Sequence, residues 1–118
     1  MNKADMPSVD QLIDRLESFM DKHIYPNEDR YQEQLDALED RFSTVPLMEE
    51  LKAKAKAEGL WNLWMPRDHG GLSNEEYCPL AEIMGRVLWS PEVFNCNAPD
   101  TGNMEVFMKY GTEAQKEE

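Results

Sequence analysis

The stretch Trp61–Leu72, WNLWMPRDHGGL, constrains the fold of this chain more than any other feature. Its backbone must bend, because Pro66 fixes φ and the pair Gly70-Gly71 permits the positive φ that other residues resist. The stretch nevertheless carries a group of large apolar side chains: Trp61, Leu63, Trp64 and Met65. A surface loop that exposed all of them would leave a sizeable apolar patch. Two interpretations follow: the stretch plugs the core of a helical domain, or it shapes one wall of a ligand cavity.

Helices are predicted on both sides of this stretch. Ser43 and Thr44 offer a cap for the first of them, and Pro46 stands where an early helical proline is tolerated. Strong helix formers then lead to Gly59, which is typical of a left-handed helix end. After the stretch, Ser73 and Glu76 form a capping-box pattern. Pro79 then removes a backbone hydrogen bond near the start of this second helix, so we expect a kink or a delayed first turn.

The amino-terminal part of the chain has a similar pattern. Ser8 and Gln11 form another capping box, and apolar residues follow at helical spacing. Because a residue before proline is pushed out of the α region, we expect this helix to stop at Tyr25, before Pro26. A weaker and mostly exposed helix is predicted over residues 27–42, where a thin apolar stripe lies among many charges.

Shorter elements are predicted towards the carboxyl end. Gly85 costs helix stability, and we expect it to mark the close approach of another helix. A short helix over residues 91–97 and a turn over residues 98–103 should follow. Thr112 then signals a helix start only about one turn before the last residue, Glu118, so we expect the chain to be truncated.

The fold class follows from these segments together. No stretch has the alternating, β-rich pattern of a strand. We therefore predict an all-α fold, an orthogonal bundle of about six helices. A chain of 118 residues is long enough for one core but not for two, so residues 1–118 should form one domain.

The charge balance excludes several classes of partner. The sequence holds 24 acidic and 12 basic residues, a formal net charge of −12. Nucleic-acid affinity comes largely from lysine and arginine that neutralise phosphates, so a nucleic-acid partner is not expected, and an anionic membrane surface is disfavoured for the same reason. No apolar run approaches the roughly 20 residues that cross a bilayer, so we expect no membrane insertion. The amino-terminal segment has no apolar signal core, which favours a cytosolic or organelle-interior protein.

Little catalytic chemistry can be argued from the residues themselves. A nucleophile needs an activating base and an orienting group, and two isolated histidines do not provide such a set. The one polar cluster of interest is Asn95, Asn97, Asp100, Thr101 and Asn103, framed by Phe94, Cys96, Met104 and Phe107. Polar groups that converge in an apolar setting suit a small-molecule pocket. The same residue types also serve as helix caps, so both interpretations stay open.

Four motifs, in order along the chain, resemble the amino-terminal helical domain of the acyl-CoA dehydrogenase family. They are the run from Gly59-Leu60 to Pro66, the turn Gly70-Gly71-Leu72, the helix end Glu82–Arg86, and Tyr110-Gly111-Thr112 with Gln115-Lys116. The similarity covers essentially residues 8–118. The segment APDTGNME is similar to a branch described as handling longer acyl chains, whereas Pro79 and the long segment WSPEVFNCNAPDTGN depart from the common pattern.

The resemblance implies that the chain is one of three domains, with a middle β domain and a carboxy-terminal helical domain absent here. In the family, a glutamate base removes the α-proton of an acyl-CoA thioester while the β-hydrogen leaves as hydride to FAD, in fatty-acid oxidation. The base and nearly all FAD contacts belong to the absent domains, so this chain alone should bind no FAD and turn over no acyl-CoA. The resemblance also implies an acceptor like the electron-transfer flavoprotein, a homo-oligomer, and a location in the bacterial cytoplasm or mitochondrial matrix.

The resemblance further implies that residues 91–103 form the far wall of the acyl pocket, with the turn at Asp100-Thr101-Gly102 closing its bottom. The substrate-binding residues would be Phe94, Asn95, Ala98, Asp100, Thr101 and Met104. An alternative function from another class is an acidic helical interaction module without catalytic activity. The gene beyond Glu118 discriminates the two, because a dehydrogenase requires a β-rich segment and then a helical segment with a glutamate base.

Overall fold

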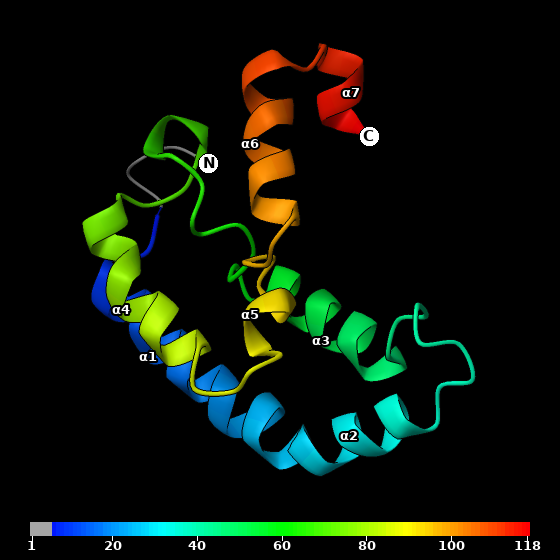
Figure 1. Ribbon diagram of the computed structural model, residues 1–118. Coiled ribbons are helices and arrows are strands. Elements are labelled where there is room, and N and C mark those ends of the chain that lie inside the picture. Colours follow the sequence, from blue (N-terminus) through cyan, green and yellow to red (C-terminus); the bar gives the residue numbers. More distant parts are fainter. Residues whose placement is uncertain (1–5) are drawn as a thin grey trace.

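A computed structural model describes residues 6–118, and every regular element in that part of the chain is helical. The α-helices are α1 (Val9–Phe19), α2 (Glu28–Asp36), α3 (Pro46–Ala57), α4 (Asn74–Met84), α5 (Ser90–Val93), α6 (Asp100–Tyr110) and α7 (Glu113–Glu117). The predicted all-α fold is confirmed, with α5 and α7 contributing about one turn each (Figure 1). None of the helices in residues 6–118 has the length and apolar character that a membrane span requires.

The start of α1 has the predicted capping box. The Gln11 amide donates to the Ser8 hydroxyl at 3.2 Å, and the Ser8 amide donates to the Gln11 side chain at 2.9 Å. One face of α1 then enters the core through Leu12, Leu16 and Phe19.

The prediction that this helix stops before Pro26 is wrong. The chain passes through a π-helical turn, Met20–Ile24, and a 3-10 turn, Tyr25–Asn27, directly into α2. Proline lacks an amide hydrogen and its ring crowds the preceding turn, and the wider π turn accommodates both effects. The Asn27 side chain donates to the His23 carbonyl oxygen at 2.8 Å and so satisfies a carbonyl near the disrupted ladder. The two predicted helices are therefore one bent helical path.

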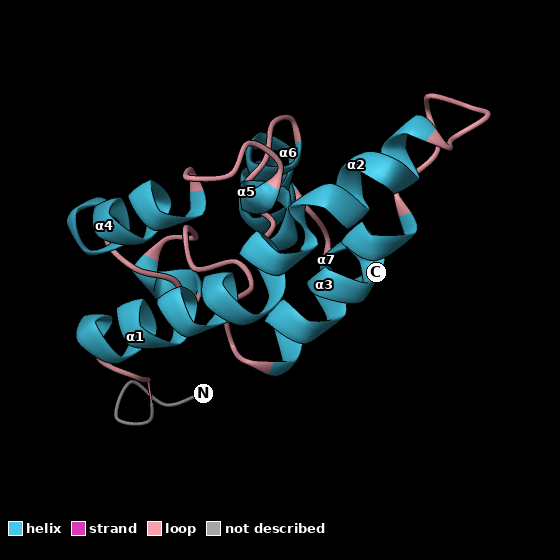
Figure 2. Ribbon diagram, turned by 90° about the horizontal axis from the view of Figure 1, so that it is seen from below, coloured by secondary structure: helices cyan, strands magenta, loops and turns pink. Residues whose placement is uncertain are grey.

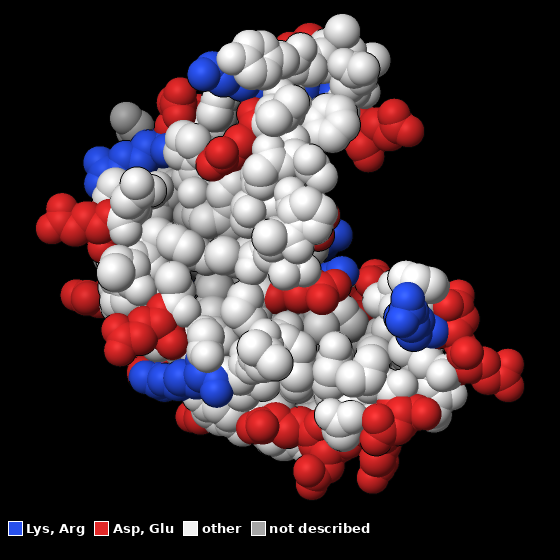
Figure 3. All heavy atoms as spheres, viewed as in Figure 1, with Lys and Arg blue, Asp and Glu red and all other residues white. Residues whose placement is uncertain are grey.

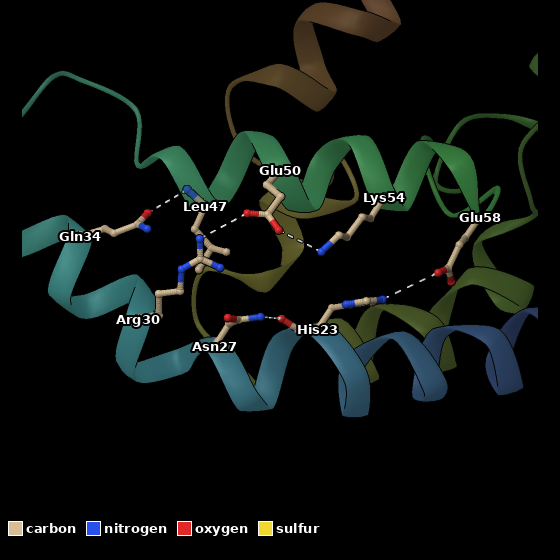
Figure 4. Close-up of polar contacts among 8 residues, drawn as sticks. All are labelled: His23, Asn27, Arg30, Gln34, Leu47, Glu50, Lys54 and Glu58. Carbon is tan, nitrogen blue, oxygen red and sulfur yellow. Dashed lines mark hydrogen bonds and ion pairs between the residues drawn. The ribbon is translucent and has the colours of Figure 1, made fainter.

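Polar side chains join α2 to α3, as Figure 4 shows. The predicted cap of α3 by Ser43 or Thr44 is not formed. Instead, the Leu47 amide in the first turn of α3 donates to the Gln34 side chain of α2 at 2.8 Å. In the next turn, Glu50 accepts from Arg30 of α2 at 3.4 Å and from Lys54 of α3 at 3.0 Å. As predicted, α2 is exposed and buries no residue, but it ends at Asp36 rather than near Phe42.

The end of α3 is the predicted left-handed stop. Gly59 has φ of +71°, the Gly59 amide donates to the Lys56 carbonyl, and the Leu60 amide donates to the Ala55 carbonyl. This is the hydrogen-bond pattern of the Schellman motif, and the buried side chain of Leu60 supplies the apolar contact that accompanies it.

The second capping box, at Ser73 and Glu76, is confirmed, but the expected delay of α4 and the expected role of Gly85 are wrong. The helix starts at Asn74 and continues through Pro79, so its first turn is not delayed. Gly85 caps its carboxyl end, and a Cβ added there would meet only carbonyls of α4 itself, at 3.3 Å or more. Gly85 therefore marks the end of a helix and not the approach of another one.

The core lies where α4 packs on α1 and where α5 packs on α3. Figures 1 and 2 both show α4 lying beside α1. The largest fully buried side chains are Phe19, Phe94, Leu12, Leu16, Met20, Ile24, Leu47, Met48, Leu51, Leu60, Leu80 and Met84. They come from α1, the π turn, α3, α4 and the residues just after α3 and α5, so one continuous core holds these segments together.

Helices α6 and α7 stand away from this core (Figure 1). The predicted helix over residues 91–97 is shorter, because α5 ends at Val93. The predicted turn over residues 98–103 is present only at Ala98-Pro99, because Asp100–Asn103 form the first turn of α6. Asparagine, aspartate and threonine are as typical of a helix start as of a turn, which explains the error. The capping box at Thr112 and Gln115 is confirmed and opens α7.

Candidate functional site

The six residues predicted to bind substrate follow one another from the end of α5 to the second turn of α6. Asn95, Thr101 and Met104 are half-buried, Ala98 and Asp100 are exposed, and Phe94 is buried. The surface of residues 6–118 includes four hollows of about 190 to 350 Å³, and none of these four is lined by any of the six residues. The structure thus places these residues on one stretch without gathering them around one of these hollows.

Phe94 belongs to the core. Its side chain is only 1% exposed, and its ring meets the ring of Phe19 edge-on, with centroids 5.3 Å apart. Edge-to-face pairs of this kind add to the stability that burial of the rings already gives. Phe94 therefore has no free surface for direct contact with a ligand in this structure.

Asn95 is bound to the Trp61–Leu72 stretch rather than directed into a cavity. Its side-chain amide donates to the Asn62 side-chain oxygen at 2.6 Å. The indole N–H of Trp64 donates to the Asn95 carbonyl oxygen at 2.7 Å. Sequence reasoning missed this pairing. The one local signal in the sequence is the residue type itself, because asparagine is enriched at positions with positive φ. Asn62 and Asn95 both occupy such positions, with φ of 62° and 59°.

The Trp61–Leu72 stretch fills the core and also lines surface hollows. Leu63, Met65 and Leu72 are buried, which supports the core-plugging interpretation. The turn is tight: the Gly71 amide donates to the Pro66 carbonyl, and a Cβ on Gly71 would collide with the Met65 backbone. The stretch contributes to three hollows, of about 320, 340 and 350 Å³, so its outer face shapes much of this surface.

The hollow of about 320 Å³ has an ion pair at its rim. It is lined by Met6, Pro7, Ser8, Val9, Arg67, Gly71, Leu72 and Glu76. The Arg67 Nε donates to Glu76 at 2.8 Å, and the Ser73 amide donates to the same carboxylate at 3.2 Å. These bonds, the one from Arg67 above all, hold the pKa of Glu76 below its ordinary value. Glu76 is thus a charged capping group that is already paired.

Tyr77, the residue after Glu76 on α4, is a second titratable group with a shifted pKa. Burial raises the pKa of its phenol well above the ordinary value, and the neighbouring Cys96 raises it further. The Tyr77 hydroxyl donates to the Met84 sulfur at 3.4 Å, about two turns along α4. A phenol kept neutral in this way serves packing and does not act as a base.

The two histidines of the described residues are paired with carboxylates and not with a hydroxyl or thiol. His23 lies 3.9 Å from Glu58 and His69 lies 3.9 Å from Asp68, and neither pair includes a serine, threonine or cysteine that the imidazole could activate. Within residues 6–118 no three side chains of histidine, cysteine, aspartate or glutamate come together as metal ligands. The feature of this surface that could matter for binding is its shape, because α6 projects beside the Trp61–Leu72 stretch and lines a hollow together with it.

FAD, which the family resemblance implies, does not fit these residues by themselves. A drug-sized ligand occupies a pocket of about 300–1,000 Å³ with convergent polar groups, and a dinucleotide is larger still. The hollows lie at the low end of that range, and their rims carry carboxylates such as Glu76, Glu92 and Glu105. In Figure 3 acidic side chains gather over α1 and α2, whereas the visible face of α6 is largely uncharged. This chain alone offers no favourable field for a diphosphate.

Comparison with known proteins places these observations in a family. The family profile described as acyl-CoA dehydrogenase, N-terminal domain, matches residues 7–118. The chain is 50% identical over 117 residues to acyl-CoA dehydrogenase family member 10 of Mus musculus, with 93% of this chain and 11% of the relative covered. It is 46% identical over 111 residues to acyl-CoA dehydrogenase family member 11 of Gallus gallus, with 92% and 14% covered.

A solved structure agrees with these sequence relatives. A Mycobacterium abscessus protein assigned to the acyl-CoA dehydrogenases superposes with a TM-score of 0.75 at 46% identity, over 95% of this chain and 30% of that chain. The chain therefore spans less than a third of the length of each of these proteins. Its sequence and its fold show that the chain belongs to the acyl-CoA dehydrogenase family and corresponds to the N-terminal domain of that family.

Proposed function

We propose that this chain is the first domain of a flavin-dependent enzyme that introduces an α,β double bond into an acyl-CoA thioester in fatty-acid oxidation. The observation that carries the proposal is the continuous match of residues 7–118 to the family's N-terminal domain, supported by the solved structure at 46% identity. FAD, the glutamate base, an acceptor like the electron-transfer flavoprotein and the contacts of a homo-oligomer would belong to other parts of the intact protein or to its partners. Its location would be the bacterial cytoplasm or the mitochondrial matrix.

Within that enzyme, we propose that the first two turns of α6 form the far wall of the acyl pocket. The structure supports this for Thr101 and Met104, whose side chains are half-buried on a helix that contributes nothing to the core. Ala98 and Asp100 are exposed at its base. Met104 suits such a wall, because its unbranched thioether repacks around different chains. Phe94 would support the wall from inside the core.

The test uses the intact protein and the ratio of kcat/KM for long and short acyl-CoAs. Met104→Phe should fill part of the pocket and lower the long-to-short ratio by about 10-fold, which is the discrimination that one methylene can give. The matched control is Met108→Phe, the same exchange one turn further along α6, where the side chain lines the hollow with Pro66 and His69 instead.

Two results would contradict the proposal at different levels. An equal ratio in both variants, with normal folding, would remove Met104 from the pocket wall. An intact protein that carries no flavin and reduces no dye with any acyl-CoA would contradict the enzymatic assignment itself.

The acidic surface favours a second candidate, an interaction module without catalysis. The net charge of −12 and the carboxylates over α1 and α2 would suit a basic protein partner. Reading the gene beyond Glu118 separates the candidates, because only the dehydrogenase requires a β-rich segment followed by a helical segment with a glutamate base.

A further inference from the structure

The position of α6 depends on the segment that leads into it. α6 buries none of its own residues, and its cap residue Pro99 makes no side-chain capping bond. Its first backbone bonds run back to that segment, from the Thr101 amide to the Asn97 carbonyl at 3.0 Å and from the Asn103 amide to the Pro99 carbonyl at 3.1 Å. Because no core side chain anchors α6, whatever holds residues 95–99 also determines where α6 begins.

Three polar residues hold the start of this segment, and we call Asn62, Trp64 and Asn95 the asparagine clamp. Two of its hydrogen bonds are described above: the one between the two asparagine side chains and the one from the Trp64 indole to the Asn95 carbonyl oxygen. In the third, the backbone amide of Asn62 donates to the Phe94 carbonyl oxygen at 3.3 Å. Three hydrogen bonds thus connect two turns that lie more than 30 residues apart in sequence.

Each half of the clamp is next to a buried residue of the core. Leu63 follows Asn62 and is 6% exposed, and Phe94 precedes Asn95 and is 1% exposed. Each asparagine is also held in the left-handed backbone region, where few other side chains are found. The clamp therefore fixes Asn95 relative to the core. Only the few residues from Asn95 to Pro99 separate this fixed point from the exposed base of α6.

We propose that Asn62, Trp64 and Asn95 are positioning residues that fix the base of α6 and thereby set the acyl-chain length that the enzyme prefers. The part that concerns acyl length rests on the proposed function above. Asn95, expected from the family resemblance to bind substrate, would then act through its neighbours and not by contact. One methylene more or less in an apolar pocket changes kcat/KM by about 10- to 200-fold, so even a small shift of this wall would change the preference between acyl-chain lengths.

The test combines Trp64→Phe, which removes the indole N–H and keeps an aromatic ring, with Trp61→Phe as the matched control. Trp61 belongs to the same loop, and its ring lies under the Lys56 ammonium, 4.4 Å from the ring centroid. Asn95→Gly is a second variant, because glycine adopts the left-handed backbone and lacks the side-chain donor to Asn62; since glycine also frees the backbone, Trp64→Phe is the decisive variant. Hydrogen exchange of backbone amides 95–104 and the long-to-short ratio of kcat/KM are both measured in the intact protein.

We expect Trp64→Phe and Asn95→Gly to speed exchange over amides 95–104 about three- to tenfold, as loss of one hydrogen bond implies, while Trp61→Phe does not. The acyl-length ratio should change about threefold or more in the same two variants. Equal exchange in Trp64→Phe and Trp61→Phe would overturn the clamp. Faster exchange with an unchanged ratio would overturn its role in selectivity. A wild-type protein inactive on every acyl-CoA would count against the proposed function instead, and exchange would still decide the clamp.

Discussion

The burial of Phe94 leads to a quantitative prediction about stability. Removing a fully buried phenylalanine ring from a core costs about 3–5 kcal/mol, and Phe94 is 1% exposed. We therefore expect Phe94→Ala to lower the free energy of unfolding by about 3–5 kcal/mol, a large share of the 5–15 kcal/mol usual for a domain. The edge-on contact with Phe19 contributes a separate coupling energy. In a double-mutant cycle of Phe94→Ala and Phe19→Ala, the coupling between the two rings should be about 0.5–1.5 kcal/mol.

The assay is urea unfolding followed by far-ultraviolet circular dichroism, on the wild type, both single variants and the double variant. Phe42→Ala is the matched control, because the same ring is removed from a side chain that is 81% exposed, and its effect should stay within about 0.5 kcal/mol. A cost for Phe94→Ala close to that of Phe42→Ala, or a coupling indistinguishable from zero, would refute the assignment of Phe94 to the core.

Three further predictions concern backbone conformation, capping and pH. Gly59→Ala should cost about 1 kcal/mol in urea unfolding, because φ is +71°, whereas Gly102→Ala, in α6 with open space around it, should stabilise by up to about 1 kcal/mol; equal signs would contradict this. Ser73→Ala should cost about 0.5–2 kcal/mol through loss of the α4 cap, and an unchanged midpoint would count against the capping box. The lowered pKa of Glu76 favours the folded state above about pH 4.5, so the difference in stability between wild type and Arg67→Gln should shrink as the pH falls below that value and not grow.

Much of the fold could be predicted because its signals are local. The capping boxes at Ser8, Ser73 and Thr112 each lie within four residues, and each marks the start of a helix in the structure. The errors come from residues whose local preference has more than one solution. Pro26 did not end its helix, because a π turn accommodated it, and Pro79 lies inside α4.

The arrangement around α6 could not be predicted in the same way. Trp64 and Asn95 are 31 positions apart, and no periodicity in the sequence connects them. Phe94 and Met104 are both apolar and ten positions apart, yet one is buried and the other half-exposed, because Phe94 directly follows α5, which packs on α3, whereas Met104 lies on α6, which buries no residue. Family resemblance points to this segment, whereas the role of each residue in it depends on contacts that only three dimensions reveal.

The π turn between α1 and α2 has a consequence for how length variation in this segment would act. The Tyr25 amide bonds to the Met20 carbonyl, five residues back, where an α-helix would reach four, so the turn contains one residue more than an α-helical turn. Because this π turn of five residues winds about as far around the axis as an α turn of four, deleting a single residue from positions 20–24 would restore α-helical spacing and leave the orientation of α2 nearly unchanged. Tyr31 would then remain stacked on Trp89, with ring centroids 4.4 Å apart. A one-residue deletion inside α1 or α2 would instead turn the later residues by about 100° about the helix axis, so the π turn is the place in this helical path where a gap can be absorbed.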